Sequence, residues 1–336
     1  MKYVVDVLKK MPDSANYNAW SKAPADVIRT LNSTGVQSEF IIVPDLKLKI
    51  VSFFIGIVRT LKFAMKLKKN DTLYMQRYGY YMSLLASLSK VKGVELNYIV
   101  HDLTFLRFGN KKTSASEIKL LKKVDVIFAH TEKMVDALKG CGVNTMCKVM
   151  HLFDYYSDDA MMPIEDTLAM KQIVAFAGNL DKSAFLKDFV SRDGLGNVQY
   201  RFYGIKKEFM FPENGCFEYA GIFSPSNTGY IKAGWGLLWD GNSVETCAGA
   251  MGEYLKINSS HKLSLYLACG LPLIVWSGSS LAYWLNAKGV CVLIDSLDEI
   301  PSKISELAEE DFFNMTKNAR MLGEELRRGE FLKNLL

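Results

Sequence analysis

A histidine and an acid stand side by side after an apolar run in the first half of the chain. The run is LNYIV; His101 and Asp102 follow it, and Arg107 comes shortly after. If LNYIV is a strand of a parallel sheet, these side chains lie at the carboxyl edge, where open α/β sheets bind ligands. An imidazole or a carboxylate there can take a proton from a hydroxyl group. A structural pair, with Asp102 as a cap and His101 packed, is the alternative.

A second group combines serines with two basic residues at the start of an apolar helical pattern. Ser259 or Ser260 can cap a helix whose first turn carries His261 and Lys262. Backbone N–H groups, the helix dipole and two basic side chains would then converge, which suits a diphosphate. A solvated helix start is the alternative, but cations at a helix N-terminus oppose the dipole and need an anion beside them. We therefore predict an anion site.

The loop GNLDKS follows the apolar run QIVAFA. Gly178 allows close backbone approach, Asn179 offers an amide and Lys182 can meet a phosphate, although an ordinary turn explains the loop when it is taken alone. The chain has no GxGxxG and no GxxxxGK[ST] pattern, which argues against a Rossmann dehydrogenase and a P-loop enzyme. A diphosphate must therefore be held in another way.

Metal chemistry has little support in the sequence. His130 and His151 also follow strand-like runs, but neither has a carboxylate or cysteine at ligand spacing. The chain contains no HExxH, no paired cysteine ligands and no DxD triplet. We expect neither a metal nor a cofactor.

The segment PDSANYNAWSK, Pro12 to Lys22, is predicted to be a loop. Asn16 and Trp20 within it can hydrogen-bond to and stack on a sugar. An ordinary surface loop fits the segment equally well.

Strand-like runs alternate with helical patterns along the whole chain, which is typical of βαβ units and parallel sheets. In the first half the runs are KYVVDVL, EFIIVP, DTLYMQ, LNYIV and Val124–Ala129, with a last one near Lys148–Phe153. In the second half they are QIVAFA, VQYRFYGI, WGLLW, LPLIVW and GVCVLID. The pattern predicts an α/β protein of two Rossmann-like domains. We place them at 1–155 and 171–315, with a linker at 156–170 and a closing helix at 316–336 that can pack back on the first domain.

Length and composition agree with this organisation. The chain has 336 residues, of which 49% are hydrophobic and 23% charged, so two globular domains are expected. Asp6 and Lys9 interrupt any signal peptide, and the longest apolar run of the first half, Ile50 to Val58, is too short to cross a bilayer. The six cysteines show no CxxC spacing. We expect a cytoplasmic protein.

A basic and apolar stretch runs from Lys47 to Lys69. It carries seven basic residues and no acid among phenylalanines, isoleucines and leucines, so a helix here can lie on an anionic membrane at the inner face of the cell membrane. The alternative is a helix with its apolar side on the sheet and its lysines in water. No basic stripe interleaved with aromatics supports nucleic-acid binding. The oligomeric state stays open, with a dimer as one option.

One long segment carries a family resemblance. GLLWDGNSVETCAGAMGEYLKINSSHKLSLYLACGLPLIVW, Gly236 to Trp276, closely resembles the bacterial β-1,6-galactofuranosyltransferases of O-antigen assembly and their glucosyltransferase relatives. Weaker similarity extends to HDLTFLR, the AGNL loop, the FYG turn and the closing ELRRGEFLKNLL. The first fifty residues match least.

The resemblance implies a GT-B fold, in which two Rossmann-like domains face each other across a cleft, with no metal and with a uridine-diphosphate sugar held mainly by the second domain. It implies that the following residues surround the uridine diphosphate: Asn179, Lys182, Tyr203, Gly204, Asp240, Lys256, Asn258, Ser259, Ser260, His261 and Lys262. Asp102 inherits the role of candidate base beside His101, while Asn16, Trp20 and Arg107 are expected to contact sugar or acceptor.

The expected activity is transfer of galactofuranose from UDP-galactofuranose to a hydroxyl of an O-antigen or capsule precursor, with inversion and a lipid-linked acceptor. Inversion needs a base on the acceptor hydroxyl and positive groups on the departing diphosphate. One rival is a glucosyltransferase that uses UDP-glucose on a protein-linked or lipid-linked glycan. A second rival is a non-catalytic partner subunit of a glycosyltransferase.

Overall fold

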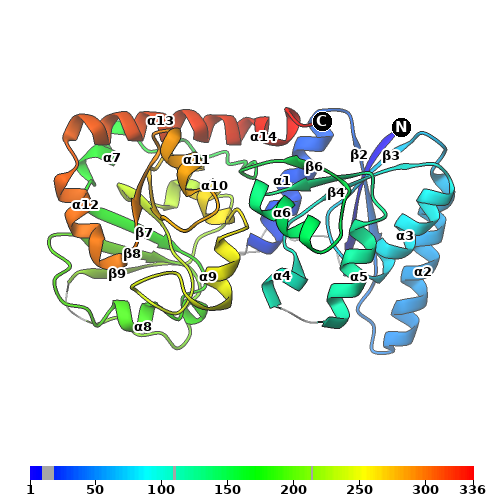
Figure 1. The fold of residues 1–336 in the computed structure, drawn as a ribbon, viewed down its shortest axis with the longest axis horizontal. Helices are drawn as coiled ribbons and strands as arrows, with labels where there is room; N and C mark the ends of the chain where they lie inside the picture. Colours follow the sequence, from blue (N-terminus) through cyan, green and yellow to red (C-terminus); the bar gives the residue numbers. More distant parts are fainter. Residues whose placement is uncertain (10–18, 109–110, 213–214) are drawn as a thin grey trace. The chain divides into compact units, whose positions relative to one another are not determined.

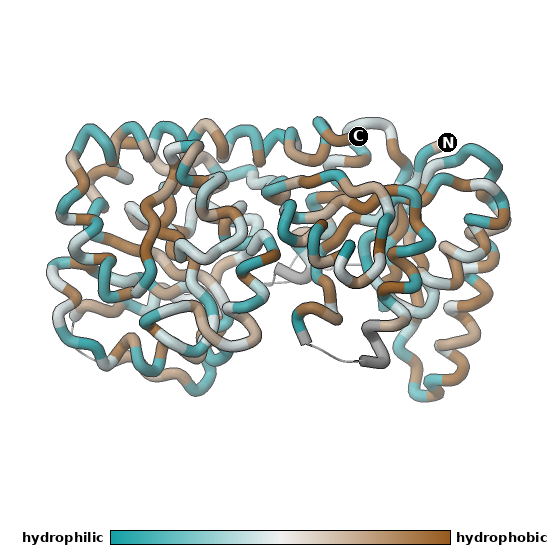
Figure 2. Tube along the Cα trace, in the orientation of Figure 1, coloured by the Kyte–Doolittle hydropathy of each residue, from teal (hydrophilic) through white to brown (hydrophobic). Residues whose placement is uncertain are grey.

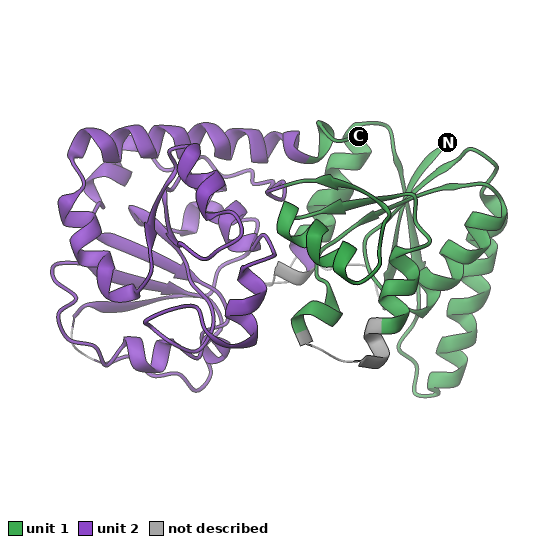
Figure 3. Ribbon diagram, viewed as in Figure 1, with its two compact units in different colours: residues 1–16, 23–150, 332–336 green, residues 17–22, 151–331 purple. Residues whose placement is uncertain are grey.

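The computed structural model describes residues 1–9, 19–108, 111–212 and 215–336, without the side chains of residues 19, 20, 108 and 111–114. The chain divides into two compact units (Figures 1 and 3). Unit 1 contains residues 23–150 and 332–336 together with the first strand, and unit 2 contains residues 19–22 and 151–331. Each unit is built on one parallel sheet.

Unit 1 has a six-stranded parallel sheet in the order β2-β1-β3-β4-β5-β6. Its strands are β1 (Lys2–Leu8), β2 (Gln37–Ile42), β3 (Thr72–Met75), β4 (Glu95–Ile99), β5 (Val126–Ala129) and β6 (Met146–Val149). The connecting helices are α1 (Ala19–Ser33), α2 (Lys49–Lys66), α3 (Tyr80–Val91), α4 (Thr104–Phe108), α5 (Lys111–Leu121) and α6 (Glu132–Gly140). The core is formed by apolar strand residues such as Val5, Leu73 and Ile127, each with no exposed area.

Unit 2 has a second six-stranded parallel sheet in the order β12-β11-β10-β7-β8-β9. Its strands are β7 (Ile173–Ala177), β8 (Gln199–Tyr203), β9 (Phe217–Gly221), β10 (Trp235–Leu238), β11 (Leu273–Trp276) and β12 (Cys291–Ile294). Its α-helices are α7 (Ile164–Ala169), α8 (Leu186–Phe189), α9 (Gly249–Leu255), α10 (His261–Ala268), α11 (Ala282–Ala287), α12 (Ile300–Glu306), α13 (Glu309–Arg328) and α14 (Glu330–Lys333). Short 3-10 turns lie at η1 (Leu180–Lys182), η2 (Thr228–Tyr230) and η3 (Leu297–Glu299).

Several predicted elements have different bounds in the structure. The segment FEYAG forms β9 at the edge of the second sheet, although we predicted no strand there. The sixth strand of unit 1 ends at Val149, because His151 takes a left-handed backbone with φ of 59° and turns the chain. Helix α1 already begins at Ala19, so Trp20 and Lys22 belong to a helix and not to a loop, and Pro24 lies inside it.

The predicted linker at 156–170 and the predicted closing helix at 316–336 also differ from the structure in detail. The segment predicted as a linker contains α7, which follows Pro163. Asp154 already belongs to unit 2, where its carboxylate accepts the backbone N–H of Phe331 at 3.0 Å. The tail forms α13 and α14 around Gly329, whose φ of 75° ends α13. Residues 332–336 belong to unit 1, where Lys148 donates to the carbonyl of Leu335.

No helix within the described ranges is long and apolar enough to cross a membrane.

Candidate functional site

The strand order of unit 2 creates a switch point between β7 and β10. From β7 the chain continues outward to β8 and β9 on one side, and β10, β11 and β12 extend on the other. Loops that leave the carboxyl ends of two such strands turn in opposite directions, which opens a crevice where α/β sheets bind ligands. A ligand of unit 2 is therefore expected to bind between the loops after β7 and β10.

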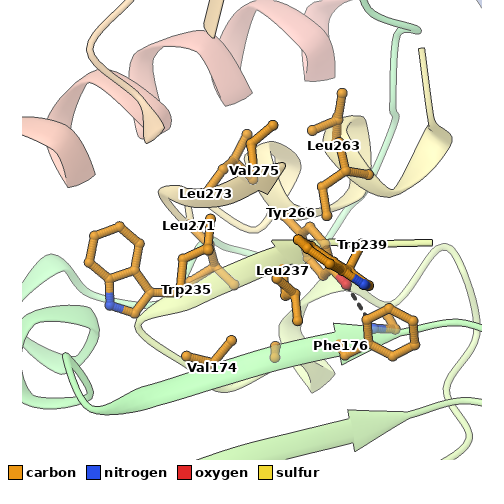
Figure 4. Close-up of a cluster of buried hydrophobic side chains, with 14 of the residues drawn as sticks. Val174, Phe176, Trp235, Leu237, Trp239, Leu263, Tyr266, Leu271, Leu273 and Val275 are labelled. Carbon is orange, nitrogen blue, oxygen red and sulfur yellow. Dashed lines mark hydrogen bonds between the residues drawn. The ribbon is translucent and has the colours of Figure 1, made fainter. Parts of the chain in front are cut away.

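Strands β7 and β10 separate toward their carboxyl ends. A side chain there accepts a backbone N–H that the neighbouring strand does not reach. The ladder pairs Trp235 with Val174 and Gly236 with Ala175, and it extends no further. Beyond it the N–H of Ala177 donates to the hydroxyl of Tyr266 on α10 at 2.7 Å (Figure 4). Tyr266 thereby anchors α10 to the carboxyl end of β7.

Lys262 lies on the first turn of α10, next to these strand ends. Ser260, one of the two serines predicted as a cap, accepts the N–H of Lys262 at 3.4 Å. The Lys262 ammonium donates to the carbonyl of Trp239 at 3.3 Å and lies 4.2 Å from the ring centre of Phe176. A Cβ placed on Gly178 would meet Lys262 Cε at 3.5 Å, an ordinary van der Waals contact, so the loop after β7 lies directly beside the lysine.

The charge of Lys262 is poorly compensated in this position. Burial lowers the pKa of Lys262 from its usual 10.5, and the negative charge of Asp240 opposes that effect. In the part of the chain that the structure describes, no carboxylate oxygen lies within 4.0 Å of its ammonium. A desolvated cation held by carbonyl and aromatic groups is a good site for an anion.

The loops after β7 and β8 are joined by backbone contacts. Gly178 N–H donates to the carbonyl of Tyr203 at 2.9 Å, and Gly204 has a φ of 128°. A Cβ on Gly204 would lie 1.9 Å from the carbonyl oxygen of Gly178, so only glycine fits. The structure thus brings the predicted Asn179 and Gly204 loops together beside Lys262.

A short turn after Gly178 fixes this pair of loops. Asn179 caps η1 by accepting the N–H of Lys182 at 3.2 Å. Asp181 accepts the N–H groups of Lys207, Glu208 and Phe209 at 2.9–3.0 Å, and these bonds lower the pKa of its carboxyl group. These hydrogen bonds therefore fix the backbone of the turn that carries Asn179 and Lys182.

Other predicted donor residues of unit 2 have roles in packing. The Tyr203 side chain is buried, and its hydroxyl contacts the backbone of Lys232 at 3.0 Å, so only its backbone reaches the loop. Lys256 is partly exposed, and its ammonium donates to Glu253 at 2.7 Å. The ring of His261 packs against Phe153 and Tyr155, with ring centres 5.8 and 5.0 Å away.

The remaining predicted residues lie near the same loops. Asp240 follows β10, where its carboxylate accepts the N–H of Gly241 at 2.9 Å. The Asn258 carbonyl accepts the hydroxyl of Ser280 at 2.5 Å. Ser259 is buried, with 3% of its area exposed. Sequence reasoning missed Ser280, although SGSS directly follows a predicted strand, which is the signal that could have found it.

In unit 1, His101 and Asp102 lie at the carboxyl edge of the sheet, as their position after β4 predicted. His101 Nε2 lies 3.0 Å from Gln76 Oε1, and Gln76 follows the neighbouring strand β3. Asp102 accepts a bond from Arg107 at 2.7 Å, and both side chains are partly exposed. Gln76 was missed, although a polar residue directly after a predicted strand is the pattern that identified His101.

Helix α4 follows this pair, and a buried acid holds its first turn. Glu117 accepts the N–H groups of Thr104 and Phe105 at 3.2 Å. Burial raises the pKa of Glu117, and the two backbone bonds lower it by a smaller amount. Arg107 is presented to Asp102 from this helix.

His130 is a buried core histidine at the end of the adjacent strand β5. Its Nε2 lies 2.9 Å from the carbonyl of Val100 and must donate to it, and burial lowers its pKa to about 4. Among the described residues, no group of three His, Cys, Asp or Glu could hold a metal ion. Asn16 lies outside the described residues, as does the side chain of Trp20.

The buried His130 predicts a loss of stability in mild acid. The unfolded chain takes up a proton near pH 6.5 but the folded chain only near pH 4, so unfolding is favoured progressively as the pH falls from 6.5 to 4. Over this pH range the free energy of unfolding falls by roughly 3 kcal/mol through His130. His130→Gln keeps an N–H for the Val100 carbonyl and should flatten the pH dependence by up to about 1.4 kcal/mol per pH unit. Urea unfolding at pH values between 7 and 4.5 checks this, and equal slopes in both proteins would contradict it.

A solved structure has a similar fold. HepE of Anabaena, crystallised in complex with UDP, aligns over 100% of this chain and 98% of its own, with a TM-score of 0.64 at 11% identity. Two units that are each built on a parallel six-stranded sheet define a protein of the GT-B fold.

The chain belongs to the Glucosyltransferase 3-like family, whose N-terminal domain matches residues 6–152 and whose C-terminal domain matches residues 174–336. It is 27% identical to the β-1,6-galactofuranosyltransferase WbbI of Escherichia coli, over 85% of this chain and 84% of the relative. It is 24% identical to glucosyltransferase 3 of Streptococcus parasanguinis, over 74% of this chain and 70% of the relative.

Proposed function

We propose that the protein transfers galactofuranose from UDP-galactofuranose to a hydroxyl of an O-antigen or capsule precursor, with inversion and without a metal ion. The observation that carries the donor class is the Lys262 ammonium at the switch point of unit 2, held by a carbonyl and an aromatic ring. The likeness to a galactofuranosyltransferase over most of the chain supports the sugar. We propose a lipid-linked acceptor, used at the inner face of the cell membrane.

The chemistry assigns separate roles to the two sheet edges. The diphosphate of a UDP-sugar already carries one negative charge on each phosphate, and cleavage of the bond to the sugar adds a further negative charge to the terminal phosphate. A fixed cation near it lowers the barrier because that charge grows in the transition state. Lys262 supplies this cation, with the N-terminus of α10 behind it. In unit 1, His101 or Asp102 is the candidate base that takes the proton of the acceptor hydroxyl as oxygen attacks the sugar.

A second candidate function is glucose transfer from UDP-glucose to a protein-linked or lipid-linked glycan. The family description and the streptococcal relative support it. The two functions share the diphosphate site and differ in the sugar. A non-catalytic partner subunit would need no such site.

Ligand protection against thermal unfolding tests the proposal. A ligand that binds only the folded state raises the melting temperature, and a concentration 100 times Kd adds about 2.7 kcal/mol. We expect shifts with UDP and UDP-galactofuranose, measured without added metal, and none with GDP or NAD. A larger shift with UDP-glucose than with UDP-galactofuranose would favour the glucosyltransferase, and no shift with any uridine nucleotide would favour the non-catalytic subunit.

A further inference from the structure

Helix α2 of unit 1 buries small side chains and exposes large apolar ones, which is the reverse of an ordinary amphipathic helix. The side chains that it buries are mostly small: Ser52, Gly56, Thr60 and Ala64, spaced four residues apart, with Phe63 beside them. A helix that covers a sheet usually buries its large apolar residues and exposes its polar ones. In α2 the large apolar residues are left on the other side.

Close packing explains why the buried side must be small. A Cβ on Gly56 would lie 2.4 Å from the ring of Tyr81 on α3, and Tyr81 donates its hydroxyl to the carbonyl of Phe53 at 3.3 Å. Thr60 donates its hydroxyl to the carbonyl of Gly56 at 2.7 Å, so this polar side chain is satisfied within the helix. The arrangement fixes which side of α2 faces unit 1.

The outward side carries a continuous apolar stripe. Its residues recur at helical spacing, and much of each side chain is exposed: Ile50 (65%), Phe54 (57%), Val58 (62%), Leu61 (40%) and Met65 (73%). Leu48 before the helix and Tyr80 at the start of α3 are exposed as well, at 67% and 56%. Figure 2 shows α2 with many hydrophobic turns. Exposed apolar surface of this extent on one helix indicates a binding surface.

The charges around this stripe have one sign. Seven basic residues and no acid lie between Lys47 and Lys69. Lys49 and Lys66 pair with Asp45 and Glu39. Within the described residues, Lys47 and Lys62 have no carboxylate oxygen within 4.0 Å. A second copy of the chain would bring the same positive charge against itself, whereas an anionic surface complements it.

We propose that α2 docks on the surface of an anionic phospholipid membrane, with the stripe Ile50, Phe54, Val58, Leu61 and Met65 in the headgroup region and the lysines on phosphate groups. Apolar side chains supply burial in the interface, and each basic residue near an anionic surface strengthens binding about fivefold. The helix lies on the membrane and does not cross it. This docking deepens the proposed function, since it would place the enzyme where a lipid-linked acceptor resides.

Vesicle flotation of the full chain tests the proposal. We expect binding to vesicles that contain phosphatidylglycerol, and much weaker binding to vesicles of phosphatidylcholine alone. The double variant F54S/V58S should lower the partition coefficient at least about tenfold, because it removes apolar anchors. Lys62→Glu should lower it by more than about fivefold, and by less in high salt, where charges are screened.

Matched variants on α13 serve as controls. Met321 is 59% exposed and Lys317 is exposed, so Met321→Ser and Lys317→Glu make the same chemical changes away from α2 and should leave binding unchanged. Equal binding of F54S/V58S and wild type would overturn the proposal. So would wild-type oligomers in lipid-free sedimentation that F54S/V58S dissociates, because the stripe would then serve a second copy. Protection by UDP should be unchanged in every variant, and its absence in wild type would fail the proposed function without affecting membrane docking.

Discussion

Replacing Lys262 with alanine is expected to lower turnover about 100-fold to 1,000-fold while the protein stays folded. The ammonium of Lys262 is the cation that the structure fixes at the switch point of unit 2, 3.3 Å from the Trp239 carbonyl. Without it, the negative charge that develops on the leaving diphosphate has no such partner. Turnover of the donor sugar, measured at saturating concentration, reports the loss.

The stability of the same variant should not fall, which separates this effect from misfolding. Burial lowers the pKa of Lys262, so the charged form is less favourable in the folded chain than in the unfolded chain at neutral pH. Removing the charge therefore leaves the melting temperature equal or higher in the absence of ligand. Protection by UDP should shrink.

Two further variants make the test specific. Lys256→Ala removes a lysine from the same segment, but this residue is partly exposed and already paired with Glu253, so turnover should stay near wild type. Lys262→Arg keeps a positive charge and should retain part of the activity. Wild-type turnover in Lys262→Ala would remove the phosphate role from this residue.

The second large effect is on stability, at Gly236. Alanine at this position of β10 would place a Cβ 2.2 Å from Cγ of Tyr266, a fully buried side chain. Tyr266 would have to move, and the N–H of Ala177 would lose its acceptor. Overpacking and the lost hydrogen bond together predict destabilisation by about 2–4 kcal/mol.

Urea unfolding followed by tryptophan fluorescence measures this change, because Trp235, Trp239, Trp276 and Trp284 all belong to unit 2. Gly140→Ala in α6 is the matched control. It has open space around its Cβ position and should be neutral or stabilising by up to about 1 kcal/mol. An unchanged midpoint for Gly236→Ala would show that the sheet and α10 can move apart at little cost.

The fold was largely predictable because both sheets are parallel and buried. Such strands appear as short apolar runs between helical patterns, and the six runs of the first half correspond to β1–β6. Strand β9 was missed because it is an edge strand with two residues, Glu218 and Gly221, that are unfavourable in strands. The loop predicted for Pro12–Lys22 was placed too far along the chain, because helix α1 already begins at Ala19 and contains Pro24, a residue that usually stands at the start of a helix.

The candidate site was only partly predictable. Loops after strands could be located, so Asn179 was found after its strand. Lys262 was found from the start of an apolar helical pattern, and Gly204 from the family resemblance. The direction of each side chain could not be read, because it depends on packing between distant segments. Tyr203 turns into the core and His261 packs against Phe153 and Tyr155 for this reason.

The sequence alone could not distinguish the two interpretations of α2, a helix that packs its apolar side on the sheet and a helix that faces a membrane. Its pattern of lysines and apolar residues fits a core-facing helix as well as a membrane-facing one. The contact that fixes the buried side of α2 is between Gly56 and Tyr81, which lie on different helices and become neighbours only through the packing of α2 on α3.

The hydrogen bond from Ala177 to Tyr266 makes one backbone amide a reporter for the anion site. In a regular ladder, the exchange of an amide proton with solvent reflects the opening of strands, but the partner of Ala177 is a side chain on α10. The same helix carries Lys262 in its first turn. Movement of α10 on ligand binding would therefore change the solvent protection of the Ala177 proton, while the amides of Val174 and Ala175, which lie within the paired part of β7, would hardly respond.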